Sequence, residues 1–292
     1  MAKLDKSNII LCGLPEGLED RILAYAEALV AAAPSIGDHG LSADDFRDSG
    51  IFESAIEKLR GRRSASTSEK SGFIENVLER MRSHGRIANF AFTGAGDRHD
   101  YEVTLSGNDR VSILEAKGCL DGQNTTVSMR PANADEFIIW SLCQNKGSDP
   151  KHNLWSGVHT RIGAEIIAEK KRVDALIVWD MLCGTKHRPC PKLPLGRGIT
   201  ENGRQIPPPC IYLFPRTTPD PRNNAAPATW RIEEIGFAEA LLQEFSGGAD
   251  DITYVNIETR MNGPSVERKT TLKRNGQVVA ESKWTKLKRA AR

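Results

Sequence analysis

Residues 100–117 predict a β-hairpin, and this hairpin constrains the fold more than any other stretch of the chain. Apolar and polar residues alternate along 101–105, which is the period expected of a half-buried strand. The Ser-Gly-Asn-Asp sequence of 106–109 is typical of a tight turn. The apolar run at 111–114 then predicts a returning, buried strand. We therefore expect two antiparallel strands whose outer ends lie side by side.

These outer ends carry two carboxylates and a lysine. Asp100 opens the first strand, while Glu115 and Lys117 end the second, two positions apart, so that their side chains leave the same face. Mg²⁺ prefers oxygen ligands and is usually held by one or two carboxylates together with water and phosphate oxygens. Asp100 and Glu115 would be its ligands, and the Lys117 ammonium would orient the attacking water or stabilise charge on a phosphate. The pattern indicates a site for phosphodiester hydrolysis.

The arrangement resembles the PD-(D/E)xK nuclease superfamily, which contains most restriction endonucleases. Asp100 is followed at hairpin distance by Glu115, Ala116 and Lys117, although His99 stands where the family's motif has proline. The resemblance implies Mg²⁺-dependent hydrolysis of DNA, leaving a 5′-phosphate and a 3′-hydroxyl. It also implies a restriction-endonuclease-like α/β core of order αβββαβ, a mixed sheet flanked by helices.

The resemblance covers about residues 70–182. The helix predicted at 71–83 would precede the three strands, and in the family this helix frequently supplies a further acidic residue to the metal site. Glu75 and Glu79 are the candidates, one turn apart, and we expect Glu75 to take this role. Any amphipathic surface helix also carries glutamates on its polar face, so a solvated Glu75 stays open.

The motif is short and recurs by chance. An acidic residue stands two positions before a lysine five times, at Glu115, Asp149, Glu169, Glu267 and Glu281. Glu267 with Lys269 is the serious rival, because Asp251 opens another strand pattern. The rival lacks the buried apolar lead-in of 111–114, so we favour Glu115. A solvated hairpin held by salt bridges is the non-catalytic alternative.

The remaining patterns predict an N-terminal helical segment, residues 1–63, packed on the core, and a nuclease domain at 64–292 that ends in a basic β-ribbon. The two parts could form one continuous domain. Periodicity and breaker residues predict helices at 15–33, 42–59, 71–83, 135–144, 158–171 and 237–245, and strands at 87–93, 173–181, 210–215 and 252–259.

Positive charge is concentrated near the C-terminus. Residues 260–292 hold ten Lys and Arg against two Glu, whereas the whole chain has a net charge of only +2. Asn-Gly pairs at 262–263 and 275–276 predict hairpin turns, so this stretch should form a ribbon that attracts a phosphate backbone, or that merely solubilises the chain. With the loops after Lys117 and at 184–209, the candidate DNA contacts are Gln123, Asn124, Arg130, Lys186, Arg188, Arg197, Arg204, Arg268, Lys269, Lys273 and Arg274.

Cysteine usage favours reduced thiols. The chain has six cysteines, no apolar run long enough to cross a membrane and no signal-peptide pattern, so we expect a cytoplasmic protein. Cys183, His187 and Cys190, with Cys210 as a fourth ligand, allow a structural zinc site. The compact CxxC pairs of zinc motifs are missing, so we favour buried thiols.

Together these observations predict a type II site-specific restriction endonuclease that cuts double-stranded DNA. The resemblance further implies a homodimer, in which each subunit reads half of a palindrome. Two alternatives stay open: a structure-specific repair or recombination nuclease with the same site, and a non-catalytic nucleic-acid-binding protein that uses the basic ribbon.

Overall fold

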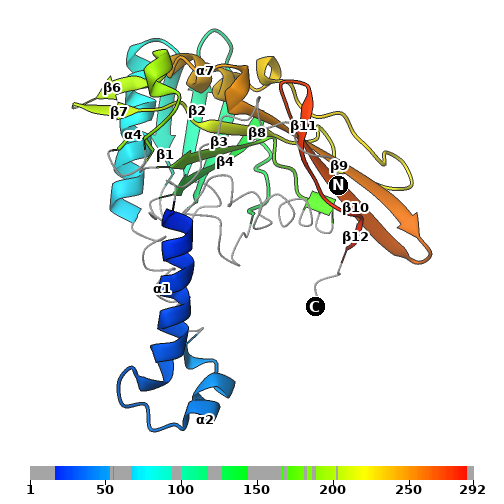
Figure 1. Cartoon of the computed structure of the whole chain (residues 1–292). Helices are drawn as coiled ribbons and strands as arrows, with labels where there is room; N and C mark the ends of the chain where they lie inside the picture. The colour runs from blue at the N-terminus through cyan, green and yellow to red at the C-terminus, as the bar shows by residue number, and fades with distance from the viewer. Residues whose placement is uncertain are drawn as a thin grey trace.

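A large mixed β-sheet forms the centre of the molecule (Figure 1). The computed structural model describes residues 17–52, 55, 67–93, 100–117, 127–143, 166–167, 170–180, 183–185, 189–201 and 203–287. Within these residues the sheet has ten strands, and a separate two-stranded hairpin lies beside it. The prediction of an α/β protein with a mixed sheet flanked by helices is confirmed.

The strands of the sheet follow the order β1-β2-β3-β4-β5-β8-β9-β10-β11, and β12 also pairs with β10. Their bounds are β1 Ile87–Phe92, β2 Tyr101–Leu105, β3 Val111–Lys117, β4 Glu136–Cys143, β5 Ala175–Asp180, β8 Cys210–Leu213, β9 Ile252–Asn262, β10 Ser265–Arg274, β11 Gln277–Glu281 and β12 Thr285–Lys286. The helices are α1 Leu18–Ala32, α2 Ala43–Asp48, α4 Thr67–Ser83 and α7 Gly236–Glu244, with short 3₁₀ turns at Ala33–Ser35, Leu193–Leu195, Ile232–Glu234 and Ala249–Asp251.

The directions of the strands place the carboxyl ends of three neighbouring strands together. β1, β2 and β3 form an antiparallel meander, whereas β3, β4 and β5 are parallel, so their carboxyl ends meet at one edge of the sheet. Lys117 at the end of β3 lies opposite Ser141 of β4. In parallel sheets ligands bind at the carboxyl ends of the strands. The predicted active-site residues therefore lie at the favourable edge.

One predicted helix is wrong. Residues 135–144 were expected to be helical, but Glu136–Cys143 forms the central strand β4. Phe137 and Ile139 are buried on one face of the sheet, and Ile138 and Trp140 on the other. A strand covered on both faces is an almost continuous apolar run, which periodicity does not distinguish from a buried helix.

The second helix of the αβββαβ order is not found in the described part of the connection to β4. Residues 127–135 contain no helix, so the described part of the chain between β3 and β4 does not supply the second helix of that order. Of the helix predicted at 158–171, only 166–167 are helical within the described residues. The structure thus shows an α/β protein with a mixed sheet flanked by helices, and the restriction-endonuclease-like core stays a proposal.

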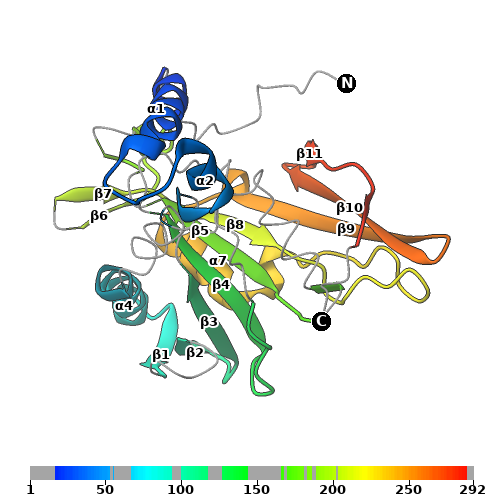
Figure 2. The same ribbon diagram turned by 90° about the horizontal axis from the view of Figure 1, so that it is seen from below.

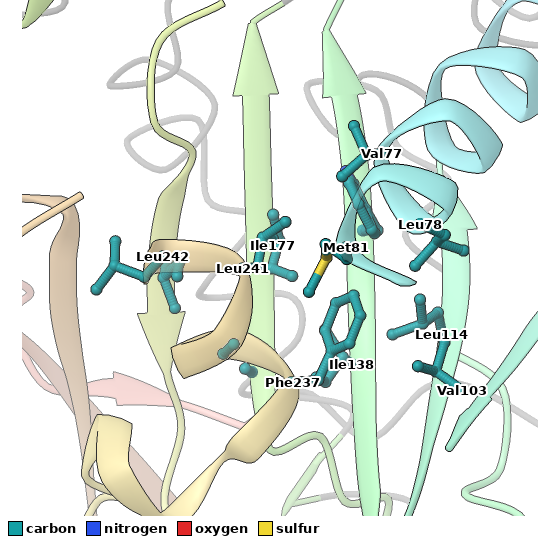
Figure 3. Packing of buried hydrophobic residues seen from close by; sticks show 14 of the residues in the cluster. Val77, Leu78, Met81, Val103, Leu114, Ile138, Ile177, Phe237, Leu241 and Leu242 are labelled. Carbon is teal, nitrogen blue, oxygen red and sulfur yellow. The ribbon is translucent and has the colours of Figure 1, made fainter. Parts of the chain in front are cut away.

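Helices α4 and α7 cover one face of the sheet (Figures 1 and 2). They confirm the helices predicted at 71–83 and 237–245. The close view in Figure 3 shows their apolar side chains meeting those of β2 to β5, with Val77, Leu78, Met81, Phe237, Leu241 and Leu242 from the helices above Val103, Leu114, Ile138 and Ile177. This packing fixes the meander β1–β3 relative to the rest of the sheet.

The second face carries its own apolar cluster. It includes Ile113 of β3, Ile139 of β4, Val127, Phe214 and Val255, all at most 2% exposed. Because neighbouring residues of a strand point to opposite faces, Glu115 and Lys117 share this second face with Ile113.

The C-terminal ribbon forms as predicted. β10 pairs with β9 and β11 in antiparallel register. Asn275 and Gly276 both have positive φ, at 49° and 75°, which is the backbone of a type I′ hairpin turn and favours Asn-Gly. The other turn is centred on Gly263 and Pro264, one position after the predicted Asn-Gly pair.

The N-terminal helix α1 is exposed. Figure 1 shows α1 extending away from the sheet, and its Leu23, Tyr25 and Val30 are 56%, 68% and 61% exposed. The apolar face predicted for this helix therefore faces solvent over the described residues. The boundary proposed at residue 63 lies outside the described residues, so the division into two parts stays a prediction. No helix of the described chain is long and apolar enough to span a membrane.

Candidate active site

The hairpin β2–β3 brings Asp100 to the end of β3. Tyr101 pairs with Leu114, and the Asp100 backbone N–H donates to the Leu114 carbonyl at 3.0 Å. The Ala116 backbone N–H then donates to Asp100 Oδ2 at 2.7 Å. The Asp100 carboxylate is thus held by the backbone N–H of Ala116, the residue between Glu115 and Lys117 in the sequence.

Glu115 and Lys117 form an ion pair on the second face of the sheet. Lys117 Nζ lies 2.5 Å from Glu115 Oε1. The Glu115 side chain is only 4% exposed, whereas that of Lys117 is 27% exposed. The carboxylate of this pair is buried, whereas the ammonium is partly accessible to solvent.

A third residue, Ser128, holds the Glu115 carboxylate. Its hydroxyl donates to Glu115 Oε1 at 2.7 Å, and its backbone N–H donates to Oε2 at 3.2 Å. Sequence reasoning did not identify Ser128. It lies 13 positions beyond Glu115 in a segment without regular secondary structure, and no local pattern announces such a contact.

The helix before the hairpin brings Glu75 close to β2, although on the other face. Tyr101 hydroxyl donates to Glu75 Oε1 at 3.3 Å. Burial raises the pKa of Tyr101, and the charges of Glu75 and Asp100 raise it further. Tyr101 pairs with Leu114, so its side chain and Glu75 lie on the face opposite Glu115. Glu75 as a metal ligand therefore stays a prediction.

The two carboxylates of the hairpin are the candidate ligands for a magnesium ion. Among the described residues no three His, Cys, Asp or Glu side chains group closely enough to hold a metal. Mg²⁺ takes only one or two protein carboxylates and completes its shell with water and phosphate oxygens. Within the described chain, Glu115 Oε2 accepts only the 3.2 Å bond from Ser128, which leaves it acceptor capacity. Asp100 and Glu115 would hold the ion.

The rival motif has a different environment. Glu267 accepts hydrogen bonds from Arg260 at 2.8 and 2.9 Å and from Asn262 at 2.7 Å, and these partners lower its pKa. Lys269 Nζ lies 2.6 Å from Glu281 rather than from Glu267.

The acidic partner of the rival is also remote. Glu267 pairs with Arg260, which stands nine positions after Asp251 along β9, or about 30 Å of extended strand. Asp251 is fully buried and binds Lys192 and Arg197. The rival carboxylates cannot share one ion, which favours the hairpin β2–β3.

Several predicted DNA contacts engage protein groups instead. Arg130 donates to the buried Asp174 and to the carbonyls of Ala134 and Asp135. Arg197 binds Asp250 and Asp251 and ties the loop at 189–201 to the start of β9. These contacts stabilise the fold and leave few donors for DNA.

The ribbon cations are similarly occupied. Arg268 is 9% exposed, and burial lowers its pKa. Arg274 donates to the Thr253 hydroxyl at 2.8 and 3.1 Å, and Lys273 is half-buried. Together with the Lys269–Glu281 pair, this makes the ribbon less available to DNA than its sequence suggests.

Five other predicted contacts have no described side chain. Gln123, Asn124, Lys186 and Arg188 lie outside the described residues, and Arg204 is placed in β7 (Arg204–Ile206) without a described side chain. Its strand pairs with β6 (Ile199–Glu201), so part of the loop predicted at 184–209 is a hairpin.

The cysteine cluster is described only in part. Within the described residues Cys183, Cys190 and Cys210 form no disulfide bond, and the first two are buried, whereas His187 lies outside the described residues. The zinc alternative therefore stays untested, and the buried thiols fit the favoured reading of Cys183 as a small apolar residue.

Comparison of the chain with protein-family models, with curated proteins and with solved structures gives no match.

Proposed function

We propose that this chain is a Mg²⁺-dependent endonuclease that hydrolyses phosphodiester bonds of double-stranded DNA, in the manner of a type II restriction endonuclease. The observation that carries the proposal is the 2.7 Å hydrogen bond from the Ala116 N–H to Asp100 Oδ2. This bond attaches the Asp100 carboxylate to the backbone N–H of the residue that stands between Glu115 and Lys117 in the sequence. The resemblance to the PD-(D/E)xK superfamily rests on the same three side chains.

Each side chain has a role that follows from its position. Bound Mg²⁺ would polarise the scissile phosphate and lower the pKa of a coordinated water. Asp100 and Glu115 would hold the ion at the carboxyl edge of the sheet. Lys117, whose side chain is 27% exposed, would orient the attacking water and offset the negative charge that builds on the phosphate oxygens.

The structure gives less support to a module that only binds nucleic acid. Such a module would rely on the C-terminal ribbon, yet Lys269 pairs with Glu281 and Arg268 is buried. A repair or recombination nuclease would use the same site as a restriction endonuclease. The DNA substrate that is cut therefore distinguishes these two proposals. Dimerisation to match a palindromic site belongs to the restriction-enzyme proposal.

The decisive experiment is a cleavage assay on unmethylated phage and plasmid DNA, at low salt, with Mg²⁺ or with EDTA. Lys117→Ala is the active-site variant, and Lys269→Ala is its matched control from the rival motif. Discrete Mg²⁺-dependent fragments that disappear in Lys117→Ala and persist in Lys269→Ala would support the proposal. Branched or single-stranded substrates, tested in parallel, would reveal a structure-specific nuclease. No cleavage of any substrate would contradict the proposal.

A further inference from the structure

Ser128 occupies an unusual position for a residue outside the predicted motif. Both of its donors, the hydroxyl and the backbone N–H, bind the carboxylate of Glu115, at 2.7 and 3.2 Å. Lys117 shares Oε1 with the hydroxyl. Two bonds from one residue to the two oxygens of a carboxylate fix the rotation of the carboxylate plane, which a single ion pair to a flexible lysine does not.

The segment that carries Ser128 is itself held on both sides. Val127 is 2% exposed and packs in the apolar cluster of the second face. Two positions after Ser128, Arg130 binds Asp174 and the carbonyls of Ala134 and Asp135. Asp174 in turn accepts bonds from the Phe137 N–H and from the Trp230 indole. Ser128 is therefore fixed before any ligand arrives.

We propose that Ser128 is the positioning residue of Glu115, and that its hydroxyl sets the affinity of the site for a divalent cation. The inference rests on the proposed function, because it takes Glu115 as a metal ligand. Groups that orient a metal ligand typically change metal affinity by about 10–100-fold when they are removed. A carboxylate that can rotate has to be ordered again on each binding event, which weakens binding.

Ser112, which lies on the same strand β3 as Glu115, provides a matched control. Ser112 donates to Glu136 Oε2 at 2.7 Å, the same bond at the same length, but Glu136 caps the N-terminus of α7 through the Gly236 and Phe237 N–H groups. Ser112→Ala and Ser128→Ala each remove one serine–glutamate bond. Only the second bond involves the proposed metal site.

The test measures Mn²⁺ binding in the absence of DNA, and its readout is the electron paramagnetic resonance signal of the free ion. We expect Ser128→Ala to weaken Mn²⁺ binding by about 10-fold, Ser128→Thr to restore most of the affinity, and Ser112→Ala to leave it unchanged. Thermal unfolding of each variant identifies any that fails to fold. In cleavage assays, Ser128→Ala should need more Mg²⁺ for half-maximal rate and approach the wild-type rate at saturation.

Two contrary results have different meanings. If the wild type binds Mn²⁺ and cuts DNA while Ser128→Ala binds like the wild type, only the positioning role is overturned. The same holds if Ser112→Ala loses as much affinity as Ser128→Ala. If the wild type neither binds Mn²⁺ nor cuts any DNA, the proposed function fails and the role of Ser128 fails with it.

Discussion

Two hairpins of this protein carry the same acid-x-lysine pattern in opposite surroundings. In β2–β3, Glu115 pairs with Lys117 and Asp100 is bonded to the residue between them. In β9–β10, Glu267 binds Arg260 across the ribbon, and Lys269 binds Glu281 on a third strand. The pattern in the second hairpin is used for cross-strand ion pairs, which hold the ribbon together.

The difference lies in the distance between the acid that opens a strand and the motif on its partner strand. The turn at 106–109 returns the chain after five strand residues, so Asp100 meets Ala116. β9 has 11 residues, and its long register carries Glu267 away from Asp251. A short hairpin brings the two acids together, whereas a long hairpin separates them.

The largest expected effect is on catalysis. Asp100→Asn removes a charge from the proposed metal site while keeping an acceptor for the Ala116 N–H, and should lower the single-turnover cleavage rate on the order of 10²–10³-fold. The free energy of unfolding should change little. A rate within a factor of two of the wild type would show that Asp100 only anchors the start of β2 to β3.

The second largest effect is on stability. Asp251→Asn leaves Lys192 and Arg197 without their buried counter-charge. Removing one partner of a buried ion pair costs about 3–5 kcal/mol, so urea unfolding should show a loss of this order. Where the variant stays folded, its cleavage rate should match the wild type. Loss of cleavage in a folded Asp251→Asn variant would contradict the assignment of the active site to β2–β3.

A smaller, pH-dependent effect is expected at Glu267. Its partners lower its pKa below the ordinary 4.5, so its contribution to stability is present above about pH 4.5 and is lost as the pH falls through the lowered value. The difference in unfolding free energy between the wild type and Glu267→Gln should therefore shrink in acid. Urea unfolding across this pH range measures it, and a difference independent of pH would argue against the Arg260 ion pair.

The smallest effect concerns Tyr101. Its pKa is raised above the ordinary 10.0, so the folded state keeps the phenol proton when the unfolded state loses it. The stability that Tyr101 contributes is present below about pH 10 and is lost as the pH rises further. Tyr101→Phe should be less sensitive to alkaline unfolding. In absorbance titrations, Glu75→Gln should ionise Tyr101 at lower pH than the wild type does, whereas an unchanged titration would mean that Glu75 is distant.

Local patterns were sufficient for the hairpins and for the helices on the sheet. Apolar and polar residues alternate along 101–105, and the Asn275-Gly276 pair favours a tight turn. Both elements can therefore be predicted from residues adjacent in the sequence. The juxtaposition of Asp100, Glu115 and Lys117 followed because only one turn separates them.

Contacts between distant segments had no local signal. Asp174 accepts bonds from Arg130, Trp230 and the Phe137 N–H, which lie far apart along the chain, and Ser128 stands 13 positions after Glu115. The side chain of Arg130 looked like a DNA contact because its buried partner is 44 positions away. β4 was taken for a helix because burial on both faces removes the alternation that marks a strand.

The sheet ends at β1, whose sequence IANFAF contains no charged residue. Within the described chain β1 pairs only with β2, and its Ala88, Asn89, Ala91 and Phe92 are exposed. Uncharged edge strands tend to pair with other extended chains, so we expect this edge to favour self-association in concentrated solution. We expect a lysine at position 91 to oppose such pairing.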